Sequence, residues 1–396
     1  MAAPPPAPLQ KGHTRNSSTD DRRVPIPRRR TKGPLDLDDP PFSPTSPTMS
    51  TPPLLSPPTH PNSRSPAPSP PPKPQTHDLS FLLHPINFHP LPLHTLPGPF
   101  LSAPSPTGTP SQLLSTLHFR AAAISAATAL TSLPPPPNNT ILHLWYTRLL
   151  SLILSHSRTL AAQEIKVFQD LNSGFYNDPI SGRSILPWEL RVLAVTLQQD
   201  ARRQVAAYYD LAAECRVAAM DTAVAEEERG RWRKRLAELG VRVANSLIQL
   251  GDMGAAARHL KGLKALEATT EIGLVYLRAG MVKEAAECLG GDDERIKGLV
   301  MMADGRWKEA VEIWGALSDE VSRNNAAVCW LYLGKLEEAR KILEGLVEEG
   351  KVSEGLIFNL ATIYELCGET SKTLKLQLAE KVAAHGREFT NSAFKM

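Results

Sequence analysis

Residues 345–351 have the spacing of a phosphate-binding loop, because their sequence GLVEEGK fits the pattern GxxxxGK. Such a loop also needs Ser or Thr after the lysine, to hold magnesium, and a strand before its first glycine. Here Val352 follows Lys351, and the preceding residues have the period of a helix. Two glutamates inside the loop would also repel phosphate. The segment therefore predicts a turn between helices, and we expect no nucleotide cofactor.

Other catalytic and metal-binding patterns are missing from the sequence. The eleven histidines include no HExxH, the four cysteines include no CxxC, and no GxSxG occurs. His84, His89 and His94 recur every five residues and could bind a metal, but polar positions on an extended strip are the explanation we favour. We predict no catalytic residue, no metal site and no cofactor, and hence a protein that is not an enzyme.

Proline divides the chain, since all 36 prolines lie at or before Pro187. Residues 1–76 hold 22 of them and almost no aromatic residue, so this segment cannot bury enough apolar surface to fold and is predicted to be a disordered tail. In residues 77–110 the prolines continue but Leu and Phe return, which predicts an extended apolar strap that docks on a helical surface. Helical periodicity starts at Ser111 and extends almost without interruption, so residues 111–396 are predicted to be an all-α solenoid.

Five segments of this helical part share one pattern: a small residue, an apolar residue three later, glycine four after that, and a small residue five later. The first small residue lets two helices approach closely, and the glycine ends the first helix in a left-handed conformation. The residues with these packing roles are Ala244, Gly251 and Ala256; Gly273, Gly280 and Ala285; Gly298, Gly305 and Ala310; Ala327, Gly334 and Ala339; and Ala361 and Gly368, with Thr373 in the last place. This spacing is similar to the tetratricopeptide repeat, although the glycines recur every 25 to 34 residues and the closing proline is missing. We expect shortened helices in the second and third copies, and large residues such as Leu289 and Trp314 that pack into the next repeat.

Charge and cysteine usage limit the location and the partners. Residues 188–396 carry 29 Lys and Arg against 32 Asp and Glu, so the helical part is not a nucleic-acid surface. The excess positive charge lies in the tail, where a nuclear-localisation or membrane-binding patch and a solvated charge run are both open readings. Scattered cysteines of the kind that pack in reduced cores, and the lack of a signal peptide or a long apolar run, predict a cytoplasmic protein.

A partner surface is expected on the first helices of the last repeats. There the polar residues Arg323, Asn324, Asn325 and Asn359 stand outside the small-residue seam, and Trp330 and Tyr364 would join them if they were exposed. Helix caps explain the polar residues equally well. The alternative function, a co-chaperone-like adaptor that binds acidic chain ends, needs a clamp of Lys, Asn and Arg, but the corresponding residues are Val241, Asn245 and Glu271.

With the repeats placed, the sequence resembles the family of trafficking protein particle (TRAPP) complex subunit 12. The resemblance rests on LHFRAAAISAATAL (117–130), LWYTRLLSLIL (144–154), ILPWELRVLAVTL (185–197), NNAAVCWLYLGKLEEARKILE (324–344), FNLATIYEL (358–366) and the tail with Phe389 and Phe394. It implies a non-catalytic scaffold subunit of a vesicle-tethering and Rab-exchange complex in ER-to-Golgi transport and autophagy. It also implies TRAPP subunits 11 and 13 as neighbours, a Rab GTPase as an indirect partner, no nucleic acid, and peripheral association with ER–Golgi or Golgi membranes through the complex.

Overall fold

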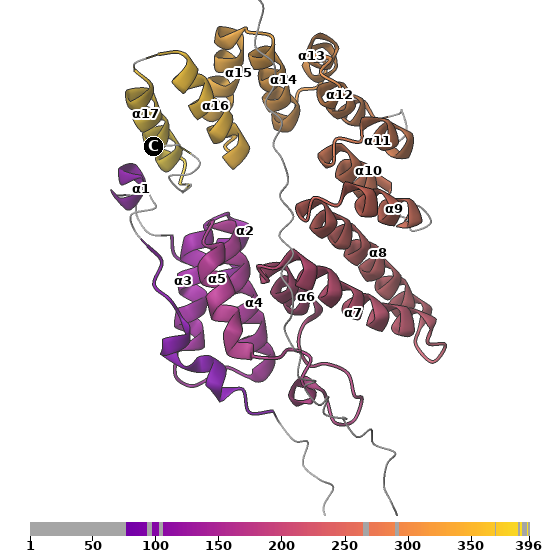
Figure 1. Cartoon of the computed structure of the whole chain (residues 1–396). Helices are drawn as coiled ribbons and strands as arrows, with labels where there is room; N and C mark the ends of the chain where they lie inside the picture. The colour runs from indigo at the N-terminus through magenta and orange to yellow at the C-terminus, as the bar shows by residue number, and fades with distance from the viewer. Residues whose placement is uncertain are drawn as a thin grey trace, which may run out of the picture. The chain divides into compact units, whose positions relative to one another are not determined.

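The computed structural model describes residues 77–92, 97–102, 106–263, 269–289, 293–368, 370–386, 389 and 394. Within these residues every regular element is a helix, and extended pairing is limited to an isolated bridge between Asn177 and Ser184. The fold is therefore all-α, as the periodicity predicts (Figure 1). The predicted disordered tail, residues 1–76, lies outside the described residues.

The helices of the N-terminal half are η1 (Ser80–Leu83), η2 (Pro85–Asn87), α1 (Gly98–Ser102), α2 (Pro110–Ser115), α3 (Phe119–Leu130), α4 (Asn138–Leu154), α5 (Arg158–Glu164), η4 (Ile165–Phe168), η5 (Gly174–Tyr176), α6 (Trp188–Leu197) and α7 (Ala201–Met220). The helices that follow are α8 (Glu226–Gln249), α9 (Met253–Leu263), α10 (Thr269–Arg278), α11 (Val282–Leu289), α12 (Glu294–Ala303), α13 (Trp307–Gly315), α14 (Glu320–Tyr332), α15 (Leu336–Glu348), α16 (Glu354–Leu366) and α17 (Ser371–Ala384).

The strap is not uniformly extended, which corrects the prediction for residues 77–110. Its described part contains η1, η2 and α1, and α2 begins at Pro110, the last residue of the predicted strap. Pro85 opens η2, Pro99 lies in the first turn of α1, and Pro110 opens α2. The first turn of a helix tolerates proline, because the missing N–H has no intrahelical acceptor there. These prolines therefore start helices and do not exclude them.

The first part of the strap docks on the helices that follow it. Leu79 and Leu82 are buried in one core with α4 and α5, and Trp145 Nε1 of α4 donates a hydrogen bond to the Leu82 carbonyl at 3.1 Å. The Phe88 ring stacks on Trp145, with 5.0 Å between the ring centroids. Apolar burial and a backbone hydrogen bond together hold this part of the strap in place.

A buried ion pair fastens the strap further along. Arg148 of α4 and Glu164 of α5 are 2% and 0% exposed, and the guanidinium meets the carboxylate at two points, at 2.6 and 2.9 Å. Glu164 also accepts the His89 backbone N–H at 2.8 Å, while Arg148 donates to the carbonyls of His89 at 2.9 Å and Ala123 at 3.0 Å. The guanidinium and the carboxylate therefore both have hydrogen-bond partners, and two of these partners are backbone groups of the strap.

Helical hairpins of the predicted kind begin within α8. This long helix packs against both α7 and α9, and Ser246 near its end still donates a hydrogen bond to Gln204 of α7. The later pairs are α10 with α11, α12 with α13, α14 with α15, and α16 with α17, each joined by a short turn (Figure 1). The second and third pairs use helices of 8 to 10 residues, whereas α14 and α15 have 13 each, which agrees with the shortened helices expected there.

The small-residue seam is closed in the first four hairpins, whereas Thr373, assigned to the last place of the fifth copy, is exposed. Every alanine of the pattern is fully buried: Ala244, Ala256, Ala285, Ala310, Ala327, Ala339 and Ala361. A Cβ at Gly273 would lie 2.2 Å from the Leu289 side chain, and one at Gly298 would lie 2.6 Å from the Trp314 indole. Leu289 and Trp314 thus fill the space over the glycine of their own hairpin, whereas we expected them to pack into the next repeat. Trp314 does both, because its cluster also includes Ala326 and Cys329 of α14.

Glycine ends the first helix of each hairpin. Gly251, Gly280, Gly305 and Gly334 have φ between 74° and 77°, and Gly368 has φ of 125°. At Gly334 the turn closes with hydrogen bonds from its own N–H to Leu331 O and from the next N–H to Trp330 O, at 3.0 and 2.9 Å. This is the Schellman arrangement, which needs a left-handed residue and therefore favours glycine.

Two further features concern the chain as a whole. No described helix is both long and apolar enough to cross a membrane. The four cysteines form no disulfide among the described residues, and Cys215 and Cys329 are buried as expected, but Cys367 is exposed at the end of α16 and is not a core residue.

Candidate protein-interaction surface

The predicted surface residues lie on α14 and α16, which are neighbours in the fold (Figure 1). Asp319 and Ser353 cap the two helices with their side-chain oxygens, which fixes where each helix starts. From this start Asn324 and Asn359 face each other, and Asn359 Nδ2 donates to Asn324 Oδ1 at 3.1 Å. The hydrogen bond ties the two helices together and keeps both amides half-buried at the surface.

Arg323 and Asn325 flank this pair on α14, and both are half-buried. Arg323 Nη1 donates to both carboxylate oxygens of Glu349, at 2.9 and 2.8 Å. This hydrogen bond lowers the pKa of the Glu349 carboxyl from its ordinary value. The guanidinium thus lies beside the turn after α15, where the Glu349 carboxylate already balances its charge.

The two aromatic residues proposed for the surface are packed more deeply than the polar ones. Tyr364 is only 5% exposed, and its hydroxyl donates to Glu344 Oε1 at 2.8 Å. Burial, followed by this hydrogen bond, raises the pKa of Tyr364. Trp330 is half-buried against the same core, with Lys335 Nζ 4.5 Å from its ring centroid. The exposure that would have made Tyr364 a surface contact is therefore not found.

Sequence reasoning missed a set of exposed apolar side chains on these same helices. They are Val321 and Tyr332 on α14 and Phe358 and Leu366 on α16. Tyr332, 63% exposed, stacks on Trp307 of α13, with ring planes 3° apart and centroids 4.1 Å apart. Phe358 and Leu366 are eight residues apart, a spacing that falls within one apolar stripe of a helix, so this periodicity is the signal that could have found them.

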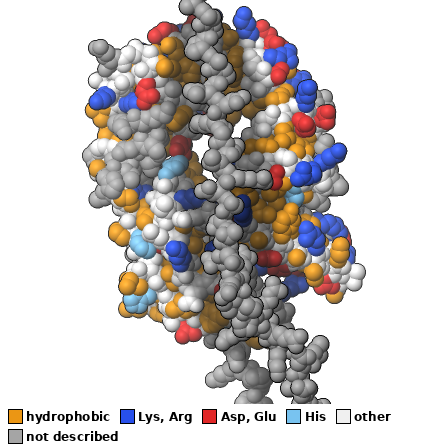
Figure 2. All heavy atoms as spheres, in the orientation of Figure 1, with side chains coloured by type: hydrophobic (Ala, Val, Ile, Leu, Met, Phe, Trp, Pro, Cys, Tyr) orange, Lys and Arg blue, Asp and Glu red, His pale blue; other side chains and the backbone are white. Residues whose placement is uncertain are grey.

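The four side chains are exposed on two neighbouring helices, where a protein partner would cover them. Figure 2 shows hydrophobic side chains interspersed with Lys, Arg, Asp and Glu on one face of the molecule. We call Val321, Asn324, Tyr332, Phe358 and Leu366 the α14–α16 face. It combines four exposed apolar side chains with one half-buried amide.

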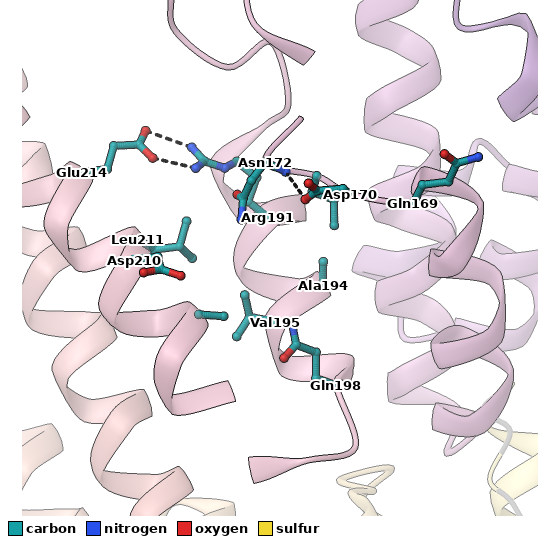
Figure 3. A pocket seen from close by; sticks show the side chains of 12 residues that line it. Gln169, Asp170, Asn172, Arg191, Ala194, Val195, Gln198, Asp210, Leu211 and Glu214 are labelled. Atoms are coloured by element: carbon teal, nitrogen blue, oxygen red, sulfur yellow. Dashed lines mark hydrogen bonds and ion pairs between the residues drawn. The ribbon is translucent and has the colours of Figure 1, made fainter. Parts of the chain in front are cut away.

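A polar pocket of about 280 Å³ lies elsewhere, between residues 169–172, α6 and α7 (Figure 3). Arg191 of α6 meets Glu214 of α7 through two hydrogen bonds of 2.9 and 2.6 Å, and the carboxylates of Asp170 and Asp210 also line it. The pocket offers one matched guanidinium and carboxylates, which suit hydrogen bonding to a polar or cationic group.

The segment with the phosphate-loop spacing has a purely structural place. Residues 345–348 form the last turn of α15, and Gly350 has φ of 72° with its N–H bonded to Val347 O at 3.0 Å. The segment is thus a helix end followed by a turn, as predicted from Val352 and the helical period. In the part of the chain that the structure describes, no group of three or more His, Cys, Asp or Glu could hold a metal ion.

Comparison with known proteins gives the repeats a family context. Trafficking protein particle complex subunit 12 of Mus musculus is 27% identical over a 350-residue alignment that covers 72% of this chain and 44% of the relative. The same subunit of Homo sapiens is 26% identical over 311 residues, with 64% and 42% covered. The chain is a distant homologue of trafficking protein particle complex subunit 12. It spans less than half the length of these curated subunit 12 relatives.

Two further comparisons add little beyond the fold. No family model matches the chain. Among solved structures, the tetratricopeptide domain of P58(IPK) is similar at 14% identity, covering 70% of this chain and 95% of that one, with a TM-score of 0.19. At that TM-score the superposition carries no weight, so the assignment to tetratricopeptide-like hairpins rests on the helix pairs, the buried seam and the glycine turns described above.

Proposed function

We propose that this chain is a non-catalytic scaffold subunit of a TRAPP complex, acting in vesicle tethering and Rab exchange during ER-to-Golgi transport and autophagy. The observation that carries the proposal is the alignment with subunit 12 over 72% of the chain. Helical hairpins that contact mainly their neighbours present long surfaces to large partners, which suits a scaffold. TRAPP subunits 11 and 13 are the partners we propose, with a Rab GTPase contacted through the complex.

We place the subunit contact on the α14–α16 face. Tyr332 and Phe358 are large aromatic side chains exposed on neighbouring helices, and aromatic anchors of this kind dominate binding energy at protein interfaces. Asn324 and Asn359 supply hydrogen-bonding groups between them. A partner that covered this face would bury the aromatic rings and keep the amides paired. The location that follows is the cytoplasm, with peripheral attachment to ER–Golgi or Golgi membranes through the complex.

Affinity purification of the tagged full chain with mass spectrometry tests the proposal. We expect other TRAPP subunits among the co-purifying proteins, and a loss of at least tenfold in their recovery for the pair Tyr332→Asp and Phe358→Asp. Leu376→Asp on α17 is the matched control, because Leu376 is a comparably exposed apolar residue outside the face. Purification without any TRAPP subunit refutes the function, while equal loss in the control variant refutes the surface.

The alternative, a co-chaperone-like adaptor outside TRAPP, gains no support from its one matching residue. Asn245 Nδ2 donates to Val241 O at 3.1 Å, and its Oδ1 accepts from Arg278 Nη1 at 2.6 Å. The amide that would hold an acidic chain end is therefore engaged within the protein. Binding of an acidic C-terminal peptide that is lost in Asn245→Ala would restore this alternative.

A further inference from the structure

The strap contributes to two separate cores. Leu79 and Leu82 lie in the core of α3 to α5, whereas Phe100 of α1 belongs to the core of the last hairpins, with α15, α16 and α17. α1 packs beside α17, although the two helices are far apart in the sequence (Figure 1). The Phe100 ring is 7% exposed and lies 5.7 Å from that of Phe394, which is fully buried.

α1 meets α17 with one side. Pro97 and Phe100 are buried, whereas Gly98 and Leu101 are exposed. Residues three apart share one face of a helix, so Pro97 and Phe100 form a short apolar edge. A helix of five residues is far below the length at which helices are stable alone in water, so the helical form of α1 depends on this contact.

The receiving surface is built by the end of the chain. Phe394 and the α17 residues Leu378 and Val382 are fully buried or nearly so, and Phe389 packs against the same cluster. Among the described helices no further hairpin follows α16 and α17, and Phe100 and Phe394 pack against the apolar side chains of this pair.

Two polar contacts join the same regions of the fold. His118 Nε2, just before α3, lies 2.5 Å from the carbonyl oxygen of Gly386, just after α17. His156 Nε2, just after α4, lies 2.6 Å from Glu354 Oε1 at the start of α16. Both are surface contacts with exposed partners, so they add little to stability, and they join the α3 and α4 region to the α16–α17 hairpin without involving α1.

We propose that α17 and Phe394 form a binding site for a short helical segment with Pro and Phe three residues apart, and that its resident occupant is residues 97–102 of the same chain. The occupant acts as an intramolecular clasp between the first helices and the last hairpin. Release of α1 unfolds it and leaves the α17 site open to a segment of the same chemistry. The clasp does not depend on the proposed membership of a TRAPP complex.

A peptide added in trans tests the site. The probe is a fluorescent peptide of residues 95–104, titrated by anisotropy into the full chain and into Phe100→Ala. We expect the Phe100→Ala chain to bind it at least tenfold more tightly than the unmodified chain, because burial of a Phe side chain is worth about tenfold to a hundredfold in affinity. Leu101→Ala is the matched control, since Leu101 is on the same helix but 53% exposed, and it should bind no better than the unmodified chain.

The Phe394→Ala variant distinguishes a specific binding site from a general loss of packing as the cause of peptide binding. This variant also frees α1, but it lacks the receiving ring, so it should not bind the peptide. Equal binding by the Phe100→Ala and Phe394→Ala chains, or no binding by Phe100→Ala while α17 keeps its protection from hydrogen exchange, overturns the proposal. A dimer of the unmodified chain by light scattering that dissociates in Phe100→Ala also overturns it, because the occupant would then come from a second copy.

Discussion

Removal of one charge from the buried Arg148–Glu164 pair should release the strap. In Glu164→Leu the guanidinium stays buried, 2% exposed, without its two carboxylate contacts, and the His89 N–H loses its acceptor. Loss of one member of a buried pair costs about 3–5 kcal/mol, because the remaining charge is uncompensated. Arg148→Met should cost a similar amount, since Glu164 would be left fully buried.

The double variant should lose much less of the free energy that holds the strap in place than the two single variants lose together. With both charges gone, the remaining penalty comes from three backbone groups that lose partners: the N–H and C=O of His89 and the C=O of Ala123. Each unsatisfied buried group costs about 1–3 kcal/mol, but the His89 side chain is exposed, so water can reach its backbone and the lower end applies. We expect the double variant to lose about 2–4 kcal/mol, and hence a coupling of at least about 2 kcal/mol.

Hydrogen exchange measured by mass spectrometry is the suitable assay. Long arrays of helical hairpins do not unfold in a single two-state step, so a global unfolding free energy would mix several events. Peptides that contain the His89 amide report local opening of the strap directly. In the single variants this amide should exchange at the rate of an unprotected group, while α14 to α17 keep their protection.

The matched control is the pair Glu238 and Arg242 on α8, which is one turn apart and about half exposed. Its double-mutant cycle should give about 0.3–0.5 kcal/mol. If the Arg148–Glu164 cycle gave a coupling as small as this control, the pair would be solvated in the folded protein and the strap would be held by apolar contacts alone.

Three further outcomes follow from the packing. Gly298→Ala should destabilise its hairpin by about 1–3 kcal/mol in local hydrogen exchange, because the new Cβ would meet the facing indole at 2.6 Å, whereas Gly262→Ala on α9, with open space around it, should be neutral or stabilising. With a thiol reagent at pH 8, Cys367 should react within minutes and Cys329 only on unfolding, because burial raises the pKa of the Cys329 thiol to about 11; rapid reaction of both would contradict this burial. Burial lowers the pKa of His259 in the folded state, so its contribution to stability is present above the unfolded value near 6.5 and is lost as the pH falls below it; His259→Asn should flatten that pH dependence of the melting temperature.

The hairpins could be predicted because their determinants are local. A small residue and a glycine at fixed spacing decide how closely two helices pack and where the first one ends, and both constraints are visible within about 15 residues of sequence. Ala327 and Gly334 illustrate this, since the first is fully buried and the second has φ of 77°. Tyr364 was harder to place, because an aromatic residue three after the small one can face the core or the solvent, and only the position of Glu344 decides it.

The strap and its contacts could not be predicted in this way. Arg148 and Glu164 lie on different helices, and nothing in their spacing indicates that both meet the backbone of His89. Proline density indicated that residues 77–110 would lack a long helix, and their described part holds only short ones, but it gave no information on the short helices that prolines can start. The contact between Phe100 and Phe394 joins two segments almost 300 residues apart, which local periodicity cannot detect.

The two anchors of the strap constrain each other. His89 is held by the Arg148–Glu164 pair, and Phe100 is held by α17, only eleven residues further along. If Phe100 detaches while His89 stays fixed, α1 remains at a high local concentration beside its site and rebinds readily. Detachment of His89 alone likewise leaves the strap tethered at Phe100. The whole strap can therefore leave the fold only when both anchors are lost, so a partner that competed for the α17 site would displace α1 without freeing the rest of the strap.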